Sequence, residues 1–214
     1  MSTGMGRLGR DALVREALAA LATNPTASMG EVATHLGVGR TTLYRHFGDR
    51  EAMIAEVARL GARLLTDALR SAQPEVGSGL DAVERVCTQL FTVPDALTLL
   101  FADNPIITDD TFAEVERERR AAAAGDGGRG GDAAVGQPRD GEGEGDAIEA
   151  VIARGQADGS ITSEVPVDWA AMYVFLTVGS GHLHSVSAGV ADREARARAL
   201  ALTIRAVRRT LAAD

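Results

Sequence analysis

The side chains of this chain that could carry out chemistry gather in one short polar segment near its N-terminus. Residues 40–47 read Arg-Thr-Thr-Leu-Tyr-Arg-His-Phe, and a further arginine follows at position 50. Guanidinium, hydroxyl and imidazole groups bind the phosphates and base edges of DNA, whereas a solvated helix face that binds nothing more often carries Glu and Gln. The segment therefore indicates a DNA-contacting surface, formed by Arg40, Thr41, Thr42, Tyr44, Arg45, His46 and Arg50.

Two short helices joined by a tight turn are needed to position this segment. Ser28 followed by Glu31 is a capping box, which predicts that a helix begins at the next residue. Gly37 ends that helix, because only glycine enters a left-handed backbone conformation without steric cost. The second helix is predicted over residues 40–47, with Leu43 filling the wedge between the two. This arrangement leaves the second helix free to enter a major groove and predicts a helix-turn-helix.

An ordinary helical hairpin is the alternative interpretation, because many all-α proteins contain an alanine and a glycine spaced like Ala33 and Gly37. The outward polar side chains of the second helix favour DNA binding. Thr41 and Arg45 are expected at base edges, since early positions of a recognition helix face the floor of the groove. The other polar residues of the segment, Arg50 included, are expected mostly at phosphates.

The same residues resemble a known family. Thr-Thr-Leu-Tyr-Arg-His-Phe at 41–47 and Gly-Asp-Arg-Glu-Ala-Met-Ile at 48–54 are similar to the recognition helix and following helix start of tetracycline-repressor-like (TetR-like) transcriptional regulators. The resemblance is specific over about Leu13 to Leu65, and beyond it only the layout is similar. It implies a homodimeric repressor that a small molecule releases from its operator. Gly39 stands where the family usually has a Ser or Thr cap, and Arg50 where it usually has Lys.

The charge distribution agrees with DNA contact at one end of the chain. The whole chain has a net charge of −8 and a pI of about 5.1, which argues against unspecific coating of nucleic acid. Residues 1–50 carry six arginines against four acidic residues, a net of +2, so the remaining residues sum to −10. A mildly basic end on an acidic chain fits a localised DNA contact. Arg7 and Arg10 are expected in a solvated tail, with a loose DNA-contacting arm as the alternative.

Several other classes of site lack support in the sequence. The single cysteine, Cys87, excludes an internal disulfide and a cysteine zinc site. No glycine-rich phosphate loop or pair of catalytic carboxylates is present, so neither a cofactor nor an enzyme is expected. No signal peptide is recognised, and the longest apolar run, Trp169 to Val178, is shorter than the roughly 20 residues that cross a bilayer. A cytoplasmic protein without membrane association is expected.

The hydrophobic spacing along the rest of the chain predicts an all-α fold. A hydrophobic content of 45% with only 4% aromatic residues indicates a core of Ala, Leu and Val, which suits helices. We expect a helix-turn-helix domain over 1–50 and a helical ligand-binding and dimerisation domain over 51–214. A long helix from Asp49 to about Ser71 joins the two. The Gly-rich stretch 125–145 is expected to be a disordered loop or linker.

A small-molecule cavity is expected in the second domain, with an apolar or mixed effector as its ligand. Tyr173 or a nearby histidine is expected to supply a polar handle. The alternative is that these residues simply fill a core. The wall is predicted to consist of Leu64, Leu65, Val86, Leu90, Phe101, Phe112, Trp169, Met172, Tyr173 and Leu176.

The two C-terminal helices are expected to form a dimer interface. The segment Trp169 to His184 is apolar nearly all round, so it must be buried on several sides. We therefore expect the helices 167–187 and 192–211 to pair with their copies in a second subunit.

Two short motifs in the first of these helices invite other chemistry. His182 and His184 point about 200° apart on a regular helix and cannot share a metal ion, so one is expected inward and the other toward solvent. Gly-Ser-Gly at 179–181 lacks the strand-turn-helix context of a catalytic serine and more simply allows close helix packing.

Three interpretations remain: a ligand-controlled DNA-binding repressor, a helical interaction protein without DNA binding, and a helical enzyme or carrier that uses the cavity alone. The outward polar residues of the second short helix separate the first interpretation from the other two.

Overall fold

The structure is a computed structural model that describes residues 9–126, 144–187 and 192–213. These residues fold into helices, without any named strand, and a single isolated bridge pairs Ile161 with Ala212. The all-α prediction is therefore confirmed. The helices are α1 (Arg10–Thr23), α2 (Met29–His35), α3 (Arg40–Phe47), α4 (Arg50–Ser71), α5 (Gly79–Leu90), α6 (Pro94–Leu100), α7 (Asp109–Asp126), α8 (Glu144–Ala157), α9 (Val167–Ser187) and α10 (Arg193–Leu211).

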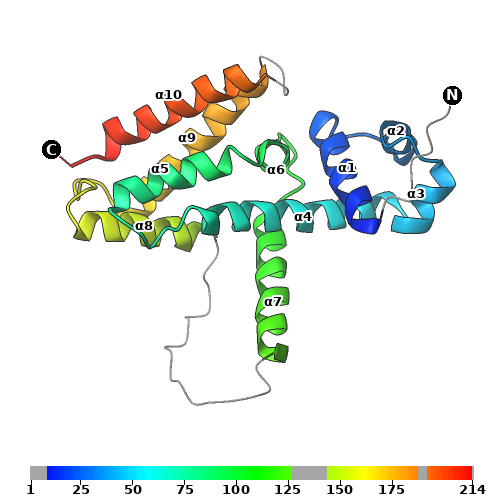
Figure 1. Cartoon of the computed structure of the whole chain (residues 1–214), viewed down its shortest axis with the longest axis horizontal. Helices are drawn as coiled ribbons and strands as arrows, with labels where there is room; N and C mark the ends of the chain where they lie inside the picture. The colour runs from blue at the N-terminus through cyan, green and yellow to red at the C-terminus, as the bar shows by residue number, and fades with distance from the viewer. Residues whose placement is uncertain (1–8, 127–143, 188–191, 214) are drawn as a thin grey trace.

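Helices α1, α2 and α3 form a compact unit at one end of the molecule, here called the head (Figure 1). The predicted capping box is present: the Ser28 hydroxyl accepts from the Glu31 amide, and the Glu31 carboxylate accepts from the Ser28 amide at 2.8 Å. Gly37 has the expected left-handed conformation, with φ of 65°. Ala33 and Leu43 are buried where α2 and α3 cross. The local sequence signals therefore build the helix-turn-helix as predicted.

The long helix α4 runs from the head along the rest of the molecule (Figure 1). The Asp49 side chain caps it by accepting from the Ala52 amide at 2.8 Å, as the sequence predicted. Near its middle, Gly61 lets Ile107 and Leu18 of α1 approach the α4 backbone. A Cβ atom added at Gly61 would lie 2.3 Å from Ile107 Cδ1 and 3.8 Å from Leu18 Cδ1. The head and the segment after α6 therefore meet on one glycine of α4.

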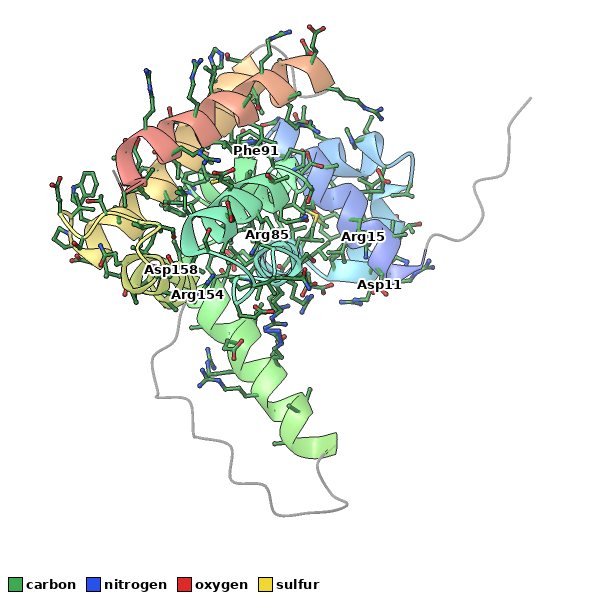
Figure 2. The ribbon with its side chains drawn as sticks, turned by 60° about the vertical axis from the view of Figure 1, so that its left-hand side comes forward. Asp11, Arg15, Arg85, Phe91, Arg154 and Asp158 are labelled. Carbon is green, nitrogen blue, oxygen red and sulfur yellow. The ribbon has the colours of Figure 1, made fainter. Side chains whose placement is uncertain are left out.

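Helices α5 to α10 form the remainder of the fold, here called the body. Its α5–α8 contact is so close that a Cβ at Gly79 would lie 2.2 Å from the Gly155 Cα. After α8, Asp158 and Ser160 accept hydrogen bonds from the first two amides of α5. Figure 2 shows Asp158 near Arg154 at this junction. Cys87, on the buried face of α5, is fully enclosed, in keeping with a structural role.

Helix α7 extends away from α4 and from the rest of the described helices (Figure 1). Ion pairs hold the two helices together: Arg59 of α4 binds Glu114 at 3.1 Å, and Arg63 binds Glu118 at 3.4 Å. Helices α7 and α8 each reach two residues into the predicted loop 125–145, because α7 ends at 126 and α8 begins at 144. Residues 127–143 of that loop lie outside the described part of the chain.

In the single chain α9 is buried on one side, so its expected burial on several sides stays a prediction that depends on a second subunit. Its small residues face inward, and Gly181 packs so closely on α10 that an added Cβ would lie 2.1 Å from the Thr203 hydroxyl oxygen. Close helix packing brings small residues to the contact, which leaves the large side chains outside. The exposed large apolar residues on the two C-terminal helices are Trp169, Met172, Phe175, Leu176, Leu183 and Leu202.

Among the described helices, none combines the length and the apolar character that crossing a bilayer requires.

Candidate nucleic-acid interface

Helix α3 presents a polar face that is anchored from behind by two apolar side chains. Leu43 and Phe47 are 0% and 5% exposed, and they fix the helix on the core of the head. On the opposite side Tyr44 is 44% exposed, and Arg45 is exposed beside it. Arg40 and Thr41 are also exposed, whereas Thr42 and His46 are half-buried. The structure thus brings six of the seven predicted DNA-contacting residues onto one short helix.

A glycine on α2 makes room for the first of these residues. A Cβ atom at Gly30 would lie 3.3 Å from Arg40 Nε and 3.4 Å from Arg40 Cζ. The guanidinium of Arg40 therefore lies across the start of α2, against its backbone. Sequence reasoning did not identify Gly30, because the reason for a glycine there is a tertiary contact.

Arg50 is placed differently from the other six residues. Its Nε donates to the Ala27 carbonyl at 3.0 Å, and its terminal nitrogen donates to the Pro25 carbonyl, also at 3.0 Å. The side chain thus ties the start of α4 to the segment that leads into α2. Its expected contact with a phosphate stays a prediction, and in the chain without DNA its guanidinium holds the backbone before α2.

Arg10 is not part of a solvated tail, so that expectation was wrong for this residue; Arg7 lies outside the described residues. Arg10 begins α1, and its guanidinium forms an ion pair with Glu56 of α4, with Nε donating to the carboxylate at 3.2 Å. A second nitrogen donates to the His46 carbonyl in the last turn of α3 at 3.0 Å. One side chain therefore connects α1, α3 and α4.

A cleft of about 410 Å³ lies between α1 and α4 beside this ion pair. Sequence reasoning missed it because its two walls come from helices far apart in the chain. Figure 2 labels Asp11 and Arg15 on the α1 wall. The cleft is lined by Arg10, Asp11, Val14, Arg15, Glu56, Arg59, Leu60 and Arg63.

The ten residues predicted to line an effector cavity differ in their burial in the single chain. Leu65, Val86 and Leu90 are buried, and Leu64, Phe101, Phe112 and Tyr173 are half-buried against the same core. Trp169, Met172 and Leu176 are instead 47%, 55% and 56% exposed on the outer face of α9. The effector cavity therefore stays a prediction, with three of its ten residues at the surface of the single chain.

The polar handle expected at Tyr173 is already engaged within the chain. The Tyr173 hydroxyl lies 2.8 Å from the Thr210 hydroxyl and donates to the Ala206 carbonyl at 3.3 Å, so it joins α9 to α10. His182, further along α9, is one of the buried polar side chains. It is 1% exposed, and its Nε2 is 2.9 Å from the Thr98 hydroxyl of α6.

The electrostatics around His182 follow from this burial. Desolvation, with a smaller contribution from Arg196, lowers the pKa of His182 to about 4, so the ring is neutral near pH 7. His184 is exposed, which confirms the prediction of one inward and one outward histidine. The glycines around Ser180 also serve close packing as predicted, because a Cβ at Gly179 would lie 2.6 Å from the Phe101 ring.

Comparison with known proteins agrees with this geometry. Residues 9–57 match the model of the bacterial regulatory proteins of the tetR family. A curated relative is the HTH-type transcriptional repressor LfrR of Mycolicibacterium smegmatis (strain ATCC 700084 / mc(2)155), 27% identical over 113 residues. That match covers 53% of this chain and 60% of the relative, which is less than two thirds of its length.

Solved structures share the fold over nearly the whole chain. The TetR-like regulator LfrR from Mycobacterium smegmatis, in complex with proflavine, has a TM-score of 0.57 at 21% identity, over 91% of this chain and 93% of that one. The ketosteroid transcriptional regulator KstR2 of Mycobacterium tuberculosis has a TM-score of 0.63 at 14% identity, with both chains fully covered. Residues 9–57 thus match the DNA-binding domain of the tetR family, and the chain as a whole shares the fold of these TetR-like regulators.

Proposed function

We propose that this protein is a dimeric, sequence-specific repressor that leaves its operator when a small molecule binds. The observation that carries the proposal is the polar face of α3, which is exposed on one side and anchored by buried Leu43 and Phe47 on the other. A helix held in this way can enter a major groove without rearrangement of the head.

Within the interface, Thr41 and Arg45 contact base edges, because they lie on the exposed face of α3. Arginine can form two hydrogen bonds with guanine, which makes Arg45 the main candidate for sequence discrimination. Arg40, Thr42, Tyr44 and His46 hold phosphates. The hydrogen bonds that Arg50 donates to two backbone carbonyls support a role in orienting α2.

Dimerisation uses the outer faces of α9 and α10. A single chain leaves Trp169, Met172, Leu176 and Leu202 between 46% and 56% exposed. Large exposed apolar side chains on two helices that pack against each other mark an interaction site. A second copy placed on these helices forms a four-helix interface and removes the apolar side chains from water.

Residues 1–50 and 51–214 act as two domains, with α4 setting the separation of the two heads. Two recognition helices read successive major grooves when they lie about 34–36 Å apart. An apolar or mixed effector binds in the body near Leu64, Val86 and Phe101 and displaces α4. Ligand and DNA then weaken each other's binding equally, because the coupling free energy is reciprocal. The relative captured with proflavine supports a small organic effector.

Selection of bound sequences from a random DNA pool tests the proposal. The expected result is a palindromic site with two half-sites, and sedimentation of the free protein as a dimer at micromolar concentration. If no sequence is enriched and the protein sediments as a monomer, the chain is instead a helical interaction or carrier protein without DNA binding.

A further inference from the structure

We propose that Arg10 and Glu56 form a strut that sets the orientation of the recognition helix relative to α4, and that Arg10 is a positioning residue rather than a phosphate contact. The inference rests on the proposed function, since it assumes that α3 reads DNA. It goes beyond that function by naming a connection between α3 and the helix expected to move.

The hydrogen bonds of Arg10 carry the argument. Its Nε and one terminal nitrogen bind the two carboxylate oxygens of Glu56, and its other terminal nitrogen donates to the His46 carbonyl. An arginine–carboxylate pair with two parallel hydrogen bonds fixes direction as well as distance. The Glu56 side chain is only 20% exposed, so its carboxylate is held in place on α4.

The contact with His46 adds a reason for this geometry. The last carbonyls of a helix lack partners within the helix, and the end carries partial negative charge. A guanidinium at that point donates a hydrogen bond to a free carbonyl, and its positive charge stabilises the helix end. Because the same guanidinium is bound to α4, a rotation of α4 carries the C-terminal end of α3 with it.

The sign of one substitution separates the strut from a direct DNA contact. If Arg10 only attracted a phosphate, Glu56→Gln would leave operator affinity unchanged or raise it, because a negative charge beside DNA is removed. If the strut operates, Glu56→Gln frees the end of α3 and lowers affinity. Arg10→Gln lowers operator affinity whether Arg10 is a strut or a phosphate contact. The Glu56→Gln variant therefore distinguishes the two roles.

The experiment measures operator affinity of the full-length protein at several salt concentrations, using the DNA selected from the random pool. We expect Arg10→Gln and Glu56→Gln each to weaken binding by roughly fivefold, with the double variant no weaker than either single variant. The slope of log affinity against log salt stays at the wild-type value, whereas loss of one phosphate contact would reduce it by about 1.

Arg15→Gln is the matched control. Arg15 is also exposed on α1, and its replacement removes the same charge, yet Arg15 has no hydrogen-bond or ion-pair partner among the described residues. Its variant should stay within about twofold of wild type. Arg10→Lys, which keeps the charge and one bond to Glu56, should recover part of the affinity even if the Gln variant folds poorly.

The outcomes distinguish the inference from the function on which it rests. Wild-type affinity in Glu56→Gln, or a salt slope reduced by about 1 in Arg10→Gln, overturns the strut while DNA binding stands. If the wild-type protein enriches no sequence, the proposed function fails first.

Discussion

The close approach of Ile107 to Gly61 provides a sharp test of how α4 is packed. A methyl group at this position would lie 2.3 Å from Ile107 Cδ1 and 3.1 Å from Ile107 Cγ1. Ile107 is 0% exposed, so its side chain has little room to withdraw. Overpacking of this kind costs about 1–3 kcal/mol of stability. The higher helix propensity of alanine offsets about 1 kcal/mol of that cost. We expect Gly61→Ala to lower the free energy of unfolding by up to about 2 kcal/mol.

The double variant makes the prediction specific to this contact. Ile107→Val removes the Cδ1 atom and alone costs about 0.5–1.5 kcal/mol. In the protein that already carries Gly61→Ala, the same change relieves the clash, so the double variant should be at least as stable as Gly61→Ala alone. Urea unfolding of the four proteins, followed by helical circular dichroism, gives the coupling free energy, expected to be about 1–2 kcal/mol.

A buried isoleucine elsewhere in the fold provides the control for this coupling. Ile148 is a buried isoleucine of α8 that a Cβ at Gly61 would not meet. Ile148→Val should therefore add to Gly61→Ala within about 0.5 kcal/mol. If the free-energy changes of Ile107→Val and Gly61→Ala are also additive, the close approach of Ile107 does not explain the glycine at position 61. That result would refute the reasoning.

Three further predictions follow from the other parts of the structure. Leu202→Arg places a charge on the exposed apolar face and should yield monomers by sedimentation, with loss of operator binding; a dimer that survives would contradict the proposed interface. Arg45→Ala should relax preference at one base position, worth roughly 1–3 kcal/mol, whereas Tyr44→Phe should weaken all sequences alike, as judged by repeated DNA selection. Because the folded-state pKa of His182 is lowered to about 4 from the usual 6.5, the unfolded chain takes up a proton first as the pH falls. Stability should therefore decrease between pH 6.5 and 4, by roughly 3 kcal/mol in all, and His182→Gln should remove that part of the pH dependence measured by urea unfolding.

The parts of the fold that could be predicted from sequence are those whose causes are local. The capping box of Ser28, the left-handed turn at Gly37 and the cap at Asp49 involve residues no more than four apart, so their signals survive without knowledge of the tertiary structure. Arg10 could not be placed in this way. Its partners Glu56 and His46 are 46 and 36 residues away, and an arginine at the start of a helix has the same appearance in sequence whether it is solvated or bound.

The residues predicted at the effector site are likewise placed by tertiary contacts that the sequence does not reveal. An apolar run such as that of α9 predicts burial, but it does not say which side faces the chain's own core. The contact of Gly181 with α10 decides the matter, because close packing of small residues turns Trp169 and Leu176 outward. Tyr173 likewise has a partner on α10 that the spacing of residues did not reveal.

The enclosure of Cys87 makes this protein suited to distance spectroscopy. Burial, with the Glu84 carboxylate nearby, raises the pKa of its thiol to about 12, so alkylating reagents leave it untouched near neutral pH. It is also the single cysteine of the sequence. A reporter thiol placed on the exposed surface of α1, for example by Glu16→Cys, is then the one position that takes a spin label. In a dimer it supplies a symmetric pair of labels, and the distance between them follows the separation of the two heads directly in solution.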